Sequence, residues 1–272
     1  MRRAFDIALL AATVLALAFL ILPILALFLR ISPVTLLEQL RSDAALDALW
    51  VTIKTGLIAH AFVLGVGTPA AYFLATRRFR GRNLAITAID LPLVLPPAVA
   101  GIALLALFAR RGLLGETIDA LGIEIAFTQV SVIIAVAFVS APFYLRAAIA
   151  AFEAVDPALV DAARTLGASP ARAFGRVALP LARGGLGAGS ALAWARGTGE
   201  FGATIMFAGS LQGLTQTLPL AIYAQLDIDP DTAIAIGALL VVLSLVVLLV
   251  VRVLPAWTRF TSVSLIRSAH SA

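Results

Sequence analysis

The residue types that carry most enzyme and metal chemistry are scarce in this sequence. It has no cysteine and only two histidines, His60 and His270, which excludes disulfides, thiolate nucleophiles and a metal site built from histidines. His60 is expected to make a buried polar contact. Together with Asp90 and Glu200 it is too scattered for an intramembrane enzyme. We therefore predict no enzymatic activity, no catalytic residue, and no metal or cofactor bound by this chain.

The most informative charge spacing joins Arg196 and Glu200, which are four residues apart in a mainly apolar segment. On a helix this spacing places both side chains on one face. Charges inside a bilayer are costly and face a bundle interior or a wet path. Two interpretations stay open: a mutually neutralising pair that fixes helix packing, or a pathway element in which Arg196 offers positive potential to an anion.

Two other charged residues, Lys54 and Asp90, are predicted to lie within the membrane, where they could pair across the second and third helices. The third helix also carries Pro92, Pro96 and Pro97. Proline has no N–H and its ring clashes with the preceding turn, so we predict a break or kink there.

The elements that must position these residues are membrane-spanning helices. Of the 272 residues, 61% are hydrophobic and 13% are charged, whereas a soluble domain is roughly half apolar and a quarter charged. Strands are excluded because the apolar runs do not alternate and are longer than the roughly ten residues of a barrel strand. We predict an all-α integral membrane protein, one domain over 1–272, with six transmembrane helices. They lie near Ile7–Leu29, Trp50–Ala75, Leu84–Ala109, Val130–Ala150, Gly184–Phe207 and Ala233–Leu254.

The arginines predict the orientation, because cytoplasmic loops carry an excess of basic residues. With both termini cytoplasmic, the outer side holds Arg30, Arg41, Arg110 and Arg111. The apolar run after Met1 is too long for a signal peptide, so the first helix is expected to be uncleaved. The cations beside the anionic inner leaflet explain the basic charge without a nucleic-acid partner. The predicted cytoplasmic set is Arg2, Arg3, Arg77, Arg78, Arg80, Arg82, Arg146, Arg164, Arg172, Arg176, Arg183, Arg252, Arg259 and Arg267.

The longest predicted cytoplasmic loop, 151–180, is patterned as two short amphipathic helices. Asp156 precedes a proline, which is the pattern of an N-cap and a first helical residue, and Ser169 repeats it. Gly167 stands where a left-handed residue would end the first helix, and Pro180 is expected to stop the second. Such a loop either rests on lipid headgroups or docks into a groove of a soluble partner.

The same loop carries a motif that resembles a known family. Permease subunits of ABC importers have Glu-Ala-Ala, three residues, Gly, nine residues and Ile-x-Leu-Pro. This chain has Asp161-Ala162-Ala163, Gly167 and Val177-Ala178-Leu179-Pro180 at those spacings, with aspartate for glutamate and valine for isoleucine. The resemblance, which covers the chain from about the second helix onward, implies the type I importer fold and a coupling helix that docks on an ATPase subunit. The implied coupling residues are Asp161, Ala162, Ala163, Leu166, Gly167, Ala168, Pro170, Phe174, Leu179 and Pro180.

The resemblance also implies partners in the inner cell membrane: a second copy of this chain, two ATP-hydrolysing subunits and an extracytoplasmic oxyanion-binding protein. The sequence has no phosphate-binding loop of the Gly-x-x-x-x-Gly-Lys-Ser/Thr type, and Lys54 is its only lysine. ATP and Mg²⁺ would therefore be bound by the ATPase subunits.

Two segments, Gly199–Gly209 and Thr215–Tyr223, resemble molybdate permeases, which are relatives of the sulfate and tungstate permeases. Ser210 departs from the asparagine common there. The resemblance implies transport of a tetrahedral oxyanion, with molybdate preferred and sulfate or tungstate as alternatives. An ion-coupled secondary transporter and a purely structural membrane subunit are the rivals from other classes. The pathway residues suggested are Arg196, Thr198, Glu200, Thr204, Thr215 and Thr217.

Overall fold

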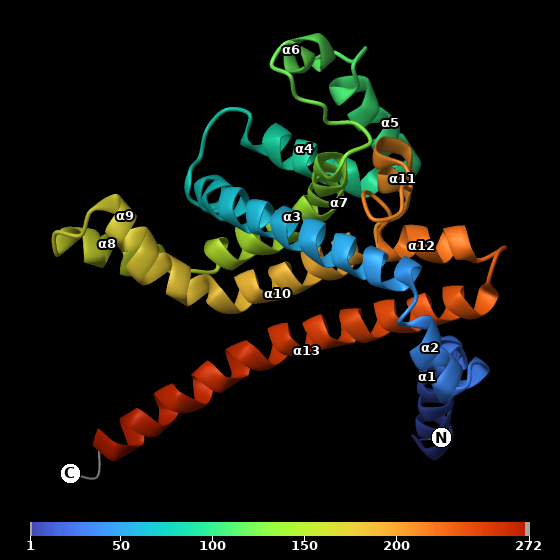
Figure 1. Ribbon diagram of the computed structural model, residues 1–272. Coiled ribbons are helices and arrows are strands. Elements are labelled where there is room, and N and C mark those ends of the chain that lie inside the picture. The colour runs from blue at the N-terminus through green and yellow to red at the C-terminus, as the bar shows by residue number, and fades with distance from the viewer. Residues whose placement is uncertain (1, 270–272) are drawn as a thin grey trace.

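The computed structural model describes residues 2–269, and the side chains of residues 5–249 within them. All regular structure in this part of the chain is helical (Figure 1). The elements, in chain order, are α1 (Arg2–Arg30), α2 (Pro33–Gln39), α3 (Asp43–Thr76), α4 (Arg82–Val94), α5 (Pro97–Phe108), α6 (Gly115–Asp119), α7 (Gln129–Glu153), α8 (Pro157–Thr165), α9 (Pro170–Ala173), the π-helical turn η1 (Phe174–Ala178), α10 (Leu179–Thr198), α11 (Gly202–Ala208), α12 (Leu218–Gln225) and α13 (Pro230–Ala269).

Four helices are long and apolar enough to cross a bilayer, namely α1, α3, α7 and α13 over the described residues. The pair α4 and α5 makes a possible fifth span, bent by 115°. The structure thus bears out an all-helical membrane protein with four to five candidate spans, while six crossings with both termini inside stay a prediction. The segment Gly184–Phe207, expected as one helix, is instead divided, because α10 ends at Thr198 and α11 begins at Gly202.

The predicted break in the third apolar stretch is confirmed between α4 and α5. Leu95 and Pro96 have extended backbone, with ψ of 133° and 135°. The residue before a proline is driven out of the helical region, and Pro96 and Pro97 follow one another here, so the helix cannot continue. Pro92 lies inside α4 without ending it.

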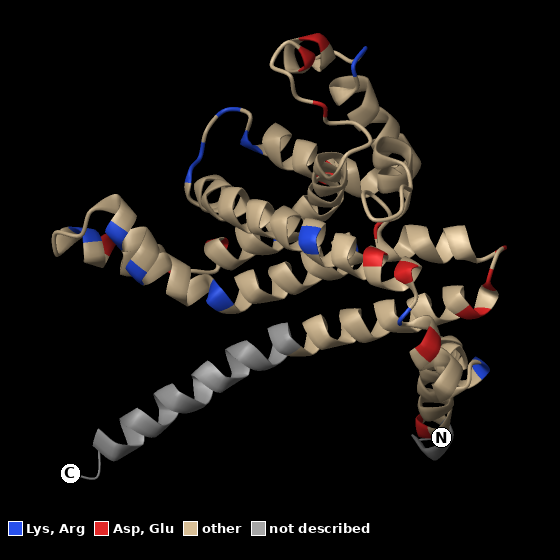
Figure 2. Ribbon diagram, in the orientation of Figure 1, with Lys and Arg blue, Asp and Glu red and all other residues tan. Residues whose placement is uncertain are grey.

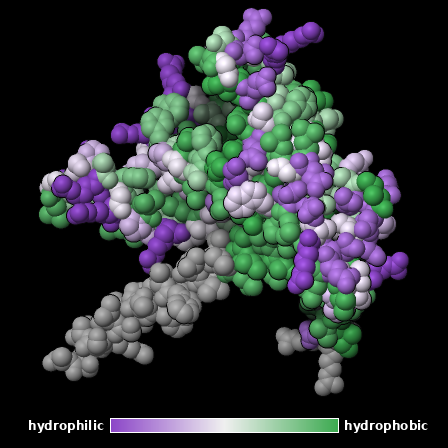
Figure 3. Space-filling view, in the orientation of Figure 1, coloured by the Kyte–Doolittle hydropathy of each residue, from purple (hydrophilic) through white to green (hydrophobic). Residues whose placement is uncertain are grey.

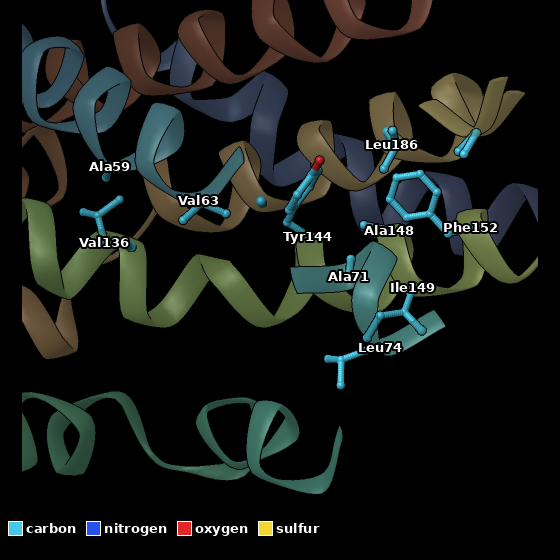
Figure 4. Packing of buried hydrophobic residues seen from close by; sticks show 14 of the residues in the cluster. Ala59, Val63, Ala71, Leu74, Val136, Tyr144, Ala148, Ile149, Phe152 and Leu186 are labelled. Carbon is cyan, nitrogen blue, oxygen red and sulfur yellow. The ribbon is translucent and has the colours of Figure 1, made fainter. Parts of the chain in front are cut away.

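The core of the molecule is formed by α3, α7 and α10, whose apolar faces meet around Val63, Tyr144 and Leu186 (Figure 4). Small residues let the helices approach closely: a Cβ on Gly189 would lie 2.7 Å from the Cβ of Ala147. Such small-residue contacts are the usual means of packing helices in membranes. The three helices form a firm frame that connects the loop after α7 with the break after α10.

Basic and acidic side chains gather at different ends of this frame (Figure 2). Lys and Arg cluster around α8, α9 and the loop between α3 and α4, whereas Asp and Glu cluster around the starts of α3 and α13. This separation is the one that the sequence predicts for cytoplasmic and outer sides, although orientation itself stays a prediction. Some of the arginines predicted to be cytoplasmic lie outside the residues whose side chains the structure describes, namely Arg2, Arg3, Arg252, Arg259 and Arg267.

Lys54 and Asp90, which the sequence allowed to pair across α3 and α4, have other partners. Asp90 Oδ1 lies 3.3 Å from Arg146 Nε on α7, and Lys54 Nζ donates to Gln129 Oε1 at 2.8 Å. Helices α3 and α4 are consecutive and run in opposite directions, so the two residues lie roughly 20 Å apart along the helix axes at about 1.5 Å per residue. A second ion pair, Arg82 with Glu153, also joins α4 to α7.

Helix α11 packs against α5 with almost no space between them. A Cβ on Gly101 would lie 2.6 Å from Met206 Cβ and 2.7 Å from the Ala203 carbonyl oxygen. Since overpacking costs about 1–3 kcal/mol, we expect Gly101→Ala to lower the thermal unfolding temperature of the purified permease. Gly65→Ala is the matched control, because nothing lies within 4 Å of its added Cβ. Equal unfolding temperatures for the two variants would contradict this packing.

Candidate functional site

The first helix of the 151–180 loop forms as its sequence predicts. Asp156 caps α8, with its Oδ1 accepting a hydrogen bond from Ala158 N at 2.9 Å, and proline occupies the first helical position. The helix leaves large apolar groups in solvent, with Leu166 88% exposed and Leu159 also exposed. Apolar side chains presented on an amphipathic helix are what a groove of another protein binds.

Gly167 ends α8 in the left-handed conformation that the sequence predicts, with φ of +87°. Two backbone hydrogen bonds close the end of the helix: Gly167 N donates to Arg164 O, and Ala168 N donates to Ala163 O, both at 3.0 Å. These are the two bonds of a Schellman motif, which require a positive φ at the glycine. The bend between the two short helices is therefore fixed by backbone hydrogen bonds.

The second helix begins as predicted but does not stop at Pro180. Ser169 Oγ accepts from Arg172 N at 3.3 Å and caps α9, and the chain then passes through η1 into α10 without a break. In a regular helix Pro180 would clash with the carbonyl of Arg176 and leave it unpaired. The wider π-helical turn, closed by Leu179 N donating to Phe174 O, makes room for the proline.

The predicted coupling residues separate into an anchoring group and a solvent-exposed group. Phe174 and Leu179 pack against the core, and the Phe174 ring lies 4.7 Å from that of Tyr72 on α3. The loop is thus held on the core from one side. The members that face solvent are Asp161, Ala162, Leu166, Gly167, Pro170 and Pro180, with Ala163 and Ala168 half-buried.

The predicted charge pair exists in the structure: Arg196 Nη2 lies 2.6 Å from Glu200 Oε2. The residue Glu200 is only 2% exposed, and its Oε1 accepts from Ala203 N at 2.7 Å. Because Oε2 has no hydrogen bond of good geometry, the contact with Arg196 is mainly electrostatic. Glu200 therefore does two things at the break between α10 and α11: it neutralises Arg196 and caps the start of α11.

Of the four threonines singled out from the sequence, Thr198 ends α10, Thr204 lies in α11, and Thr217 shares a cavity with Glu200. Thr204, Thr215 and Thr217 are buried, whereas Thr198 is half-buried. Thr198, Glu200 and Thr217 line one cavity of about 10 Å³, which has room for a single water molecule. Thr204 and Thr215 do not line it, and Thr215 Oγ1 instead accepts from Leu211 N at 3.0 Å.

Sequence reasoning missed two polar residues of this cavity, Thr52 and Thr55 on α3. Thr52 Oγ1 accepts from Leu218 N at 2.8 Å, which ties the start of α12 to α3. Their spacing of three residues on a predicted helix was an available signal. The polar contact predicted for His60 is confirmed, since its Nε2 lies 2.8 Å from Ser190 Oγ on α10, but the residue is half-buried and not buried as predicted.

An all-helical membrane protein, with a charge pair at a helix break and a capped helical loop at one end, has the features of the membrane subunit of a transporter. Residues 67–260 match the family of binding-protein-dependent transport system inner membrane components. This stretch is most of the chain, so the chain belongs to that family. It is a multi-pass permease subunit of an ABC importer in the inner membrane, and it is not itself an enzyme.

Particular relatives share most of their length with this chain. The molybdenum transport system permease protein ModB of Mycobacterium tuberculosis is 42% identical over 231 residues, which cover 85% of this chain and 88% of that protein. The sulfate transport system permease protein CysT of Escherichia coli is 34% identical, with 86% of each chain covered. A solved bacterial ABC transporter for alginate shares the fold, with a TM-score of 0.71 at 18% identity over 93% of this chain and 95% of that one.

Proposed function

We propose that this permease translocates a tetrahedral oxyanion and that its preferred substrate is molybdate. The observation that carries the proposal is the 42% identity to a molybdenum permease over nearly the full length of both chains. The sulfate permease is less similar, at 34% over a comparable length. Sulfate and tungstate are the alternative substrates of the same chemical class.

We propose that the helical unit α8, α9 and η1 is the element that docks on the ATP-hydrolysing subunit. Three features support this: the Schellman bend at Gly167, the exposed side chain of Leu166, and the aromatic anchoring of Phe174 on α3. A rigid unit anchored on the core transmits a hinge motion of its partner to the membrane helices. ATP and Mg²⁺ would be held by two such partner subunits.

The proposed assembly contains two copies of this chain with six crossings each and both termini inside, and an extracytoplasmic binding protein delivers the oxyanion. Arg196 is the proposed cation of the pathway, because its side chain is 29% exposed while its carboxylate partner is buried. An approaching dianion would compete with Glu200 for that guanidinium. Thr198, Thr204, Thr215 and Thr217 are the proposed hydroxyls of the pathway, and the buried Oγ1 atoms of Thr204 and Thr217 have no hydrogen-bond partner among the described residues.

The test is ATP hydrolysis by the reconstituted permease–ATPase complex with binding protein that is either empty or loaded. We expect stimulation mainly by the molybdate- or tungstate-loaded form, because only a loaded binding protein shifts the complex toward turnover. Stimulation by the sulfate-loaded form alone would overturn the substrate. Failure of the permease to assemble with any ATPase subunit would overturn the docking proposal. In a separate measurement of substrate uptake, loss of uptake on addition of an ionophore would favour an ion-coupled transporter.

A further inference from the structure

A second cavity lies at the end of the molecule that carries the coupling loop, and two of the predicted coupling residues, Asp161 and Pro170, are among its lining residues. It has a volume of about 550 Å³ and is lined by the last turns of α3 and α7 and by α8 and α9. Its polar rim includes three arginines, Arg77 and Arg78 after α3 and Arg164 on α8. A cavity of this size can hold a phosphate-bearing headgroup.

The rim of this cavity carries an excess of positive charge. Two carboxylates also line it, Glu153 and Asp161, but Glu153 is neutralised by Arg82. The ion pairs formed among the described side chains include none of Arg77, Arg78 and Arg164. Three exposed arginines and one carboxylate outside these ion pairs, Asp161, therefore line the cavity, and a guanidinium binds phosphate oxygens with two parallel hydrogen bonds.

Aromatic and other apolar side chains also line this cavity. Tyr72, Phe73 and Phe152 line the cavity, and the side chains of Phe73 and the neighbouring Phe79 are exposed. Helix α3 is a candidate membrane span that ends at Thr76, so Tyr72 and Phe73 lie in its last turn, next to Arg77 and Arg78. Figure 3 shows hydrophobic side chains over the middle of the molecule and hydrophilic ones around α8 and α9.

From this arrangement we propose that the cavity binds an anionic phospholipid, whose phosphate pairs with Arg77, Arg78 and Arg164 while its acyl chains lie on Phe73 and Phe79. Basic pockets beside membrane helices bind anionic headgroups in this way. A soluble anion would use the arginines but would gain nothing from exposed rings at the end of a span. The lipid would bridge α3 and α8, and would thus contact one helix of the proposed ATPase-docking unit.

The experiment is native mass spectrometry of the full-length permease in detergent, with added phosphatidylglycerol or phosphatidylcholine of identical acyl chains. We expect wild-type protein to retain phosphatidylglycerol preferentially. Each arginine near a headgroup contributes about a fivefold gain in affinity, so Arg77→Ala/Arg78→Ala should weaken retention roughly 30-fold. Arg80→Ala is the matched control, because it lies in the same loop but does not line the cavity, and its retention should stay unchanged.

Two further variants test the proposal independently. The charge-preserving variant Arg77→Lys/Arg78→Lys should keep the preference for phosphatidylglycerol, and Arg164→Ala tests the site from a different helix. Equal retention of both lipids, or equal loss in Arg80→Ala and Arg77→Ala/Arg78→Ala, would overturn the proposal. Displacement of the lipid by inorganic phosphate, but not by chloride of equal ionic strength, would show a soluble-anion site and would also overturn it.

Discussion

Replacement of Gly167 by valine is expected to abolish ATP-driven uptake while the permease stays in the membrane at normal abundance. Gly167 has φ of +87°, a region that costs an L-residue roughly 1–2 kcal/mol and costs more for a β-branched side chain. An added Cβ would meet nothing within 4 Å, so the penalty at this atom comes from the backbone conformation. Relief of this strain would open the Schellman bend and turn α8 away from its docking position.

Three substitutions of Gly167 with increasing backbone strain test this prediction quantitatively. Asparagine tolerates the left-handed region better than alanine, and alanine better than valine, so uptake by vesicles should fall in the order Gly167→Asn, Gly167→Ala, Gly167→Val. Gly175→Ala is the control, because this neighbouring glycine is equally free of contacts but lacks a positive φ. Copurification with the ATPase subunits should fall in the same order as uptake. Normal uptake by Gly167→Val would refute the role of the bend.

Replacement of Arg196 by methionine is expected to destabilise the permease strongly. The variant leaves the carboxylate of Glu200 buried and without its cation, which costs about 3–5 kcal/mol. Glu200→Gln should be milder, because the glutamine oxygen can still accept from Ala203 N, and Arg196, at 29% exposed, is partly solvated. Thermal unfolding of the purified proteins measures both effects.

The double variant Arg196→Met/Glu200→Gln separates the two interpretations of this pair. It removes both charges, so stability should recover most of what Arg196→Met loses. Uptake that recovers with stability would assign the pair to helix packing, whereas uptake that stays lost in the stable double variant would assign Arg196 to the pathway. A double variant no more stable than Arg196→Met would show that the ion pair does not hold the break between α10 and α11.

The capped loop could be predicted from the sequence because its signals are local. An N-cap needs only a side chain two or three residues from the backbone group it binds, as with Asp156 and Ala158. A left-handed helix end needs only a residue without a Cβ, as at Gly167. The break before Pro96 is equally local, since each proline restricts the residue that precedes it. The short spacing of Arg196 and Glu200 likewise brought the two side chains together, although Glu200 lies just beyond the end of α10.

Only the tertiary structure decided the contacts between residues that lie far apart in the chain. Lys54 binds Gln129 and Asp90 pairs with Arg146, because the registers of α3, α4 and α7 are set by packing. The helix continues through Pro180 because of a π-helical turn whose Phe174 packs against α3. The local sequence alone does not distinguish this π-helical turn from the end of a helix.

The amino-acid sequence by itself therefore determined the helical membrane class, the family motif and the capped bend. Each of these depends on signals that extend over only a few residues, namely an apolar run, a proline or a glycine. The burial of Thr204 and Thr217 and the basic cavity between α3 and α8 were decided only by folding. Both depend on which helix faces which, and that choice follows from the summed packing of small residues along whole helices.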